Sequence, residues 1–148
     1  MGKQRTALIA LISALLCLFA AQSFAHKGAT GIVKERMDKF SEARGQMKQM
    51  RGALQANSLD IVVEITSDMR QWAKDMPHAF PTGSDMAPSE ALPAIWDDKD
   101  GFAQAIAAYD EAIIALQQAA LLNDKPLALK KFRALGQACS NCHETYRR

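Results

Sequence analysis

The sequence lacks the patterns that several large functional classes need. Its 148 residues contain no Gly-rich phosphate loop, no Ser/His/Asp spacing and no run of alternating β-branched residues. Lys and Arg number 18 against 16 Asp and Glu, and two of the bases, Lys3 and Arg5, lie in a segment that we expect to be removed. No clustered basic face remains to bind nucleic acid. We therefore predict neither an enzyme nor a nucleic-acid-binding protein.

The long hydrophobic run of the chain lies at its start. Lys3 and Arg5 precede an apolar stretch over residues 6–21, and Ser23-Phe24-Ala25 places small residues at both positions that a signal peptidase reads. The stretch is too short and too weakly flanked to favour a membrane span. We predict a cleaved signal peptide over residues 1–25, an exported chain of residues 26–148, and no stable membrane insertion.

Beyond residue 27 the apolar residues recur every three or four positions, which predicts helices. We expect one helix from Thr30 to about Ala56, broken by Asn57-Ser58, and a second that Pro77 ends. A third is centred on residues 102–120, and a last one follows Asn123-Asp124 and runs to Tyr146. The segment 77–98 holds four of the five prolines, so it reads as a long crossover with one helical turn within residues 89–96. The predicted fold is all-α: an antiparallel up-down four-helix bundle with a Pro-rich crossover between helices two and three.

Only two cysteines remain after residue 25, and both belong to Cys139-Ser140-Asn141-Cys142-His143. Positions i, i+3 and i+4 of a helix share one face, so both thiols and the imidazole point toward one object. Two thiols can add across the vinyl groups of haem, and the adjacent His can bind its iron. A redox dithiol, a zinc site and a structural disulfide are the alternatives. The all-helical context disfavours the dithiol, zinc lacks a fourth ligand, and a disulfide leaves His143 without a role.

A signal peptide, a helical bundle and this motif close to the C-terminus resemble the class II cytochromes c, the group of cytochrome c′ and cytochrome c-556. Further similarities are residues 31–37, Pro93-Ala94-Ile95-Trp96 and Tyr146-Arg147, and the resemblance covers residues 29–148. It implies a periplasmic monohaem protein with one haem c held through Cys139 and Cys142, and with His143 as axial iron ligand. Such a protein passes single electrons to periplasmic redox proteins. Family members often pair as homodimers through helices one and two, so a homodimer is a candidate here.

The resemblance also assigns residues around the haem. Arg36 lies on the apolar stripe of helix one and corresponds to an Arg that binds the haem propionates, while Trp96 covers a haem edge and Arg147 lies near the proximal imidazole. Four residues beyond Arg36, the c-556-like proteins carry a Met as sixth iron ligand, and this chain has Phe40. We expect Phe40 to cap the distal side as in cytochrome c′, with Met37 as the alternative sixth ligand. An open site would bind NO or CO, whereas His/Met ligation would give a low-spin electron carrier.

Overall fold

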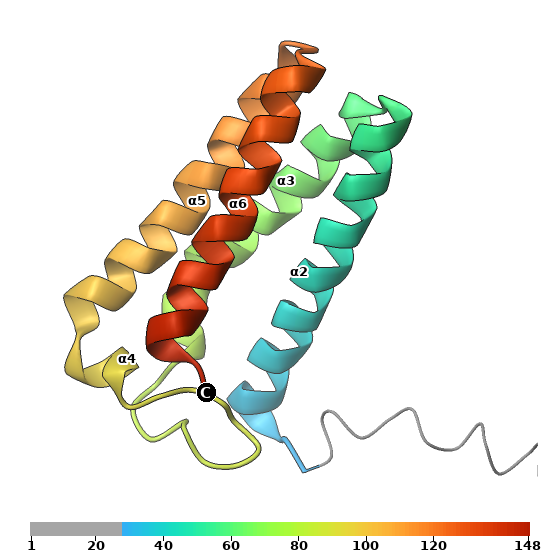
Figure 1. The fold of residues 1–148 in the computed structure, drawn as a ribbon. Helices are drawn as coiled ribbons and strands as arrows, with labels where there is room; N and C mark the ends of the chain where they lie inside the picture. Colours follow the sequence, from blue (N-terminus) through green and yellow to red (C-terminus); the bar gives the residue numbers. More distant parts are fainter. Residues whose placement is uncertain (1–27) are drawn as a thin grey trace, which may run out of the picture.

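The computed structural model describes residues 28–148, so the predicted signal peptide lies outside the described part. Four long helices form an antiparallel up-down bundle (Figure 1), which confirms the predicted fold. They are α2 (Gly31–Ala56), α3 (Leu59–Asp75), α5 (Lys99–Leu121) and α6 (Lys125–Tyr146). The α2–α3 and α5–α6 turns lie at one end of the bundle, and the crossover lies at the other.

Short polar residues set the helix ends, largely as their types predict. Asn57 takes a left-handed conformation with φ of 62° after α2, and its N–H bonds the carbonyls of Ala53 and Leu54. Asp98 caps α5 by accepting from the Gly101 N–H at 3.0 Å, and Asp124 caps α6 by accepting from the Leu127 N–H at 2.9 Å. Each of these bonds satisfies a backbone group that the helix leaves unpaired.

The crossover is more ordered than its prolines suggest. We expected Pro77 to end helix two; α3 ends at Asp75, and Pro77 lies inside a short 3-10 helix, η2 (Met76–Ala79). The helical turn that we expected within residues 89–96 is α4 (Ala94–Asp97). Residues 90–92 pair with the end of α6: Leu92 donates to the Tyr146 carbonyl at 3.0 Å, and Arg148 donates to the Glu90 carbonyl at 2.9 Å. This pairing includes an isolated antiparallel bridge between Ala91 and Arg147, and residues 28–148 form no strand.

The hydrophobic core runs along α3 and α5 from the turn end of the bundle to the crossover. Helix α5 packs extensively on both α6 and α3, while α2 has fewer neighbours. The buried residues of α2 are Arg36 and then, about four turns later, Met50, Ala53 and Leu54. Between these points the apolar residues of α2, including Phe40, Ala43 and Met47, are only partly buried and pack against the edge of the core.

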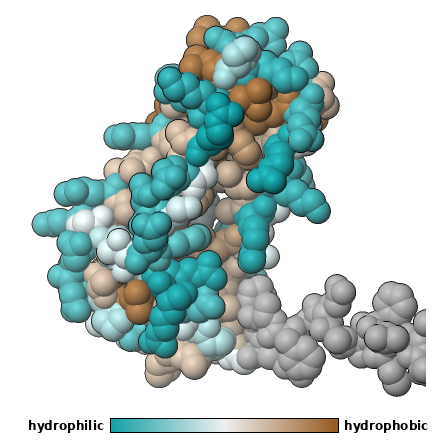
Figure 2. All heavy atoms as spheres, viewed as in Figure 1, coloured by the Kyte–Doolittle hydropathy of each residue, from teal (hydrophilic) through white to brown (hydrophobic). Residues whose placement is uncertain are grey.

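No helix in the described part of the chain has the length and hydropathy needed to cross a bilayer. Hydrophilic side chains cover most of the visible surface, and hydrophobic ones gather at the turn end (Figure 2). The large apolar residues that are most exposed are Ile61, Met86, Leu121 and Leu122.

Candidate functional site

A cavity of about 470 Å³ lies between the crossover half of α2 and the faces of α5 and α6. This volume is within the range of small-molecule and cofactor sites. The cavity brings together seven of the eight residues that the sequence singled out: Arg36, Met37, Phe40, Cys139, Cys142, His143 and Arg147. Trp96 is not part of the lining, although its neighbour Ile95 is. Its indole N–H instead donates to the Phe80 carbonyl at 3.0 Å, which holds α4 against the crossover.

The helical spacing of α6 puts Cys139, Cys142 and His143 on the cavity side. Both cysteines are half-buried and free, and burial raises the pKa of each thiol, so both are uncharged at neutral pH. The imidazole of His143 has its pKa lowered by burial and by Arg147, an effect that Glu90 partly opposes. His143 is therefore neutral near pH 7, which is the form that binds metals. No group of three or more His, Cys, Asp and Glu residues within 28–148 could hold a bare metal ion.

Arg36 is buried, with only 3% of its surface exposed, and its hydrogen-bond partners in the described part of the chain are oxygens of the crossover. Its guanidinium donates to the Ala79 carbonyl at 3.1 Å, to the Ser84 carbonyl, and to the Ser84 and Ser89 hydroxyls at 2.6 Å each. It also lies over the Phe80 ring at 4.7 Å from the ring centroid. Burial lowers its pKa, and Asp85 opposes that effect. Since four of its five N–H donors bind crossover oxygens, one remains to bind a carboxylate.

A row of aromatic rings runs along one side of the cavity, from Phe40 of α2 through Phe80 of the crossover to Phe102 of α5 and Tyr146 of α6. Phe40 meets Trp72 edge to face at 5.3 Å between centroids, and it lies 6.3 Å from Phe80. Phe80 then packs on Phe102 at 5.1 Å, and Phe102 on Tyr146 at 5.2 Å. Phe40 is thus held in place by its neighbours. Sequence reasoning did not assign Phe80 to the site, because no helical period runs through the crossover that carries it.

Glu90 is another lining residue that sequence reasoning missed. Its carboxylate accepts from Nε of Arg147 at 2.6 Å and also pairs with Nη2 of the same residue. Both side chains are about half exposed, so the pair contributes little to stability. It does fix the Arg147 guanidinium beside His143. A lone Glu among loop residues carries no sequence signal for this contact.

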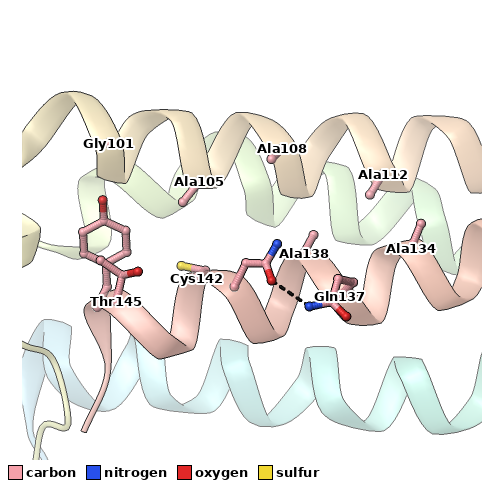
Figure 3. Close-up of a pocket in the computed structure, with 11 residues that line it drawn as sticks. Gly101, Ala105, Ala108, Ala112, Ala134, Gln137, Ala138, Cys142 and Thr145 are labelled. Atoms are coloured by element: carbon pink, nitrogen blue, oxygen red, sulfur yellow. Dashed lines mark hydrogen bonds between the residues drawn. The ribbon is translucent and has the colours of Figure 1, made fainter.

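Figure 3 shows a second hollow, of about 460 Å³, between α5 and α6. Ala105, Ala108 and Ala112 of α5 face Ala134 and Ala138 of α6 across it. None of its lining residues is charged. Ala105, Cys142 and Tyr146 line this hollow and the larger cavity alike, so only these side chains separate the two at that point.

The donor set of the larger cavity fits a covalently attached haem. The cavity has apolar and aromatic walls, two unpaired thiols and a neutral imidazole on one helix face, and a buried arginine at one end. A family model described as Cytochrome C' matches residues 31–147. The chain belongs to the cytochrome c′ family. Members of that family bind haem c covalently, and the cysteines that this requires are present near the C-terminus.

Named relatives lie in the same group. The chain is 49% identical over 74 residues to cytochrome c-554 of Cereibacter sphaeroides, a match that covers 48% of each protein. The chain thus spans about half the length of this relative. It is 29% identical over 150 residues to cytochrome c-556 of Agrobacterium fabrum, covering 98% of the chain and 96% of that protein.

The fold has solved counterparts. A nitric oxide complex of a mutant of cytochrome c prime from Alcaligenes xylosoxidans superposes with a TM-score of 0.71 at 22% identity, covering 79% of this chain and 93% of that one. At this identity the likeness supports the fold alone. It agrees with the four-helix bundle of cytochrome c′.

Proposed function

We propose that this chain is a monohaem c-type cytochrome that carries single electrons, with its haem bound to Cys139 and Cys142 and its iron ligated by His143. The observation that carries the proposal is the presence of both thiols and the neutral imidazole on the cavity face of α6. When bound, haem iron supplies a one-electron Fe(III)/Fe(II) couple. The chain's own residues anchor the ring, provide one axial ligand and exclude water from the interior of the bundle.

The packing of α2 supports the same assignment. Between Arg36 and Met50 the cavity side of this helix carries Met37, Phe40, Ala43 and Met47, which are only partly buried. Exposed apolar area of this kind costs free energy, at about 25 cal/mol per Å², unless something covers it. A flat apolar ring between α2 and α6 would cover it.

Covalent attachment is tested by expressing the full chain with the apparatus for c-type cytochrome maturation. We expect a pyridine haemochrome spectrum of the c type, and colour that stays with the polypeptide after acid–acetone extraction. Single Cys139→Ala and Cys142→Ala variants should each keep one thioether and a shifted α-band. The double variant should lose all of its haem to extraction. A colourless wild-type protein, or haem that is fully extracted from it, refutes the proposal.

On the distal side we propose that Phe40 is an apolar cap and that iron has no protein ligand there. Phe40 lines the cavity and is held by Trp72 and Phe80, and it has no atom that can bind iron. Met37 lines the same cavity and is the alternative sixth ligand. The ferric spectrum decides between them: we expect a high-spin or mixed-spin form. A low-spin form with an Fe–S(Met) band that disappears in Met37→Leu would establish Met37 as ligand.

The second candidate function is binding of NO or CO, and the absence of a ligating atom on Phe40 favours it. An iron with one open position binds such gases, and an apolar pocket offers bound dioxygen no hydrogen bond. The Alcaligenes xylosoxidans protein named above was solved as a nitric oxide complex. We expect the ferrous protein to bind CO. If the ferrous protein does not bind CO, the gas-binding function is excluded, and electron transfer remains as the proposed function.

The proposal includes export to the periplasm through residues 1–25, with periplasmic redox proteins as electron partners. Arg147 belongs to it as a neighbour of the haem, and Arg36 as a propionate ligand through its one remaining donor. Trp96 would cover a haem edge from outside the cavity lining, next to the lining residue Ile95. A homodimer through α2 and α3 is tested by measuring mass in sedimentation equilibrium.

A further inference from the structure

Tyr109 carries a polar group that no residue in the described chain satisfies. The side chain is buried, with 7% of its surface exposed, and its hydroxyl has no hydrogen-bond partner among residues 28–148. A buried hydroxyl without a partner costs about 1–3 kcal/mol. The rest of the buried stripe on α5 is apolar, formed by Phe102, Ile106, Ile113 and Leu116. A phenylalanine would pack at this position without that cost, so the buried, unpaired hydroxyl calls for a partner that the described residues do not supply.

The position of Tyr109 narrows what its partner could be. Tyr109 lines the larger cavity together with Cys139, and it lies about three turns into α5, away from the end where Arg36 meets the crossover. Burial raises the pKa of Tyr109, and negative charge on Cys139 or Asp110 raises it further, so the phenol stays protonated at neutral pH. The hydroxyl is therefore a hydrogen-bond donor on the same cavity wall that Cys139 lines.

The chain contains a second buried donor without a partner, Nε1 of Trp72, but Trp72 does not line the cavity. The other tyrosine, Tyr146, lines the cavity and donates to the Asp98 carboxylate at 2.9 Å. Among the described residues, Tyr109 combines a fully buried polar atom that has no partner with a place on the cavity wall.

We propose that the Tyr109 hydroxyl donates a hydrogen bond to the sulfur of Cys139 once that sulfur is a thioether to haem. This inference rests on the proposed function. A thioether has lost the thiol proton, so its sulfur only accepts hydrogen bonds. The carboxylates of haem are carried by the rings opposite the vinyl-bearing ones, so the sulfur is the acceptor on this edge. Tyr109 is a positioning residue: it orients the Cys139 edge and withdraws electron density from it, which favours the ferrous state.

The experiment uses haem-loaded protein, in which the pyridine haemochrome has established covalent attachment. Proton NMR of the reduced low-spin form, with CO added if iron is five-coordinate, should show a slowly exchanging phenol proton. It should give a nuclear Overhauser effect to the thioether methine at Cys139. Since the chain has two tyrosines, Tyr146→Phe leaves Tyr109 as the only phenol and assigns the signal. Tyr109→Phe should abolish it and lower the midpoint potential.

Each outcome decides the inference. Two results overturn the inference even if the haem is attached. One is a slowly exchanging phenol proton that gives no nuclear Overhauser effect to the Cys139 thioether, and the other is the lack of any slowly exchanging phenol proton. An unchanged midpoint potential in Tyr109→Phe overturns the electronic part. If Tyr109→Phe fails to assemble, the wild-type and Tyr146→Phe spectra still give the answer. A chain that takes up no covalent haem overturns the proposed function and this inference together, and the haemochrome assay identifies that case separately.

Discussion

Replacing Arg36 by Met removes a guanidinium that four oxygens of the crossover surround. The two serine hydroxyls can rotate to other partners. The carbonyls of Ala79 and Ser84 are fixed by the backbone and lose their donor. A buried acceptor left without a partner costs about 1–3 kcal/mol, so the two together cost about 2–6 kcal/mol. The long apolar Met side chain keeps part of the packing on Phe80.

The free energy of unfolding of haem-loaded Arg36→Met is measured by urea titration at 25 °C, followed by far-UV circular dichroism. We expect a loss of about 4 kcal/mol, near the middle of that range and typical of breaking a buried charged network. Arg70→Met is the matched control. Arg70 is a partly exposed helical arginine with one ion pair, to Asp110 at 3.3 Å, so its loss should cost under about 1 kcal/mol. Equal losses in the two variants would show that the Arg36 contacts do not stabilise the fold.

Three further predictions follow from the site and its surroundings. Phe40→Met should supply a sixth ligand, turning the ferric spectrum low-spin and suppressing CO uptake; an unchanged spectrum would place Phe40 away from iron. Gly101→Ala should cost about 1–3 kcal/mol in urea unfolding, because its Cβ would overlap the Asp98 carboxylate, whereas Gly52→Ala, with no atom within 4 Å, should gain about 0.5–1 kcal/mol. Burial raises the pKa of Tyr109 above its ordinary 10, so the stability it contributes is complete below pH 10 and is lost as pH rises beyond it; Tyr109→Phe should flatten that loss in urea midpoints at pH 9 and 11.

The helices were predictable because their signals are local. The apolar spacing, the break at Asn57 and the cap at Asp124 depend only on neighbouring residues, and the structure confirms them. The end of α3 was harder to predict from the sequence. Proline can end a helix, but it is also tolerated in the first turn of a new one, and Pro77 lies in the first turn of the 3-10 helix η2.

The motif on α6 was predictable for the same reason, since one helix sets the positions of both cysteines and His143. The contacts of Arg36 were not. Its burial followed from the apolar stripe, but its partners lie more than forty positions away, in a segment without periodicity. Glu90 was missed because its role depends on where the crossover meets α6. Tertiary contacts between a loop and a helix end do not affect the spacing of residue types along the sequence, so a sequence pattern cannot predict them.

Helix α2 is secured at two places, by Arg36 near its start and by Met50, Ala53 and Leu54 near its end. About 21 Å of helix spans the interval between Arg36 and Met50. In this interval Phe40, Ala43 and Met47 are only partly buried, and they pack against the edge of the core. Because α2 also has the fewest contacts with the rest of the bundle among the four long helices, a ring seated beside this interval would alter the packing of one helix and leave the α3–α5 and α5–α6 interfaces intact.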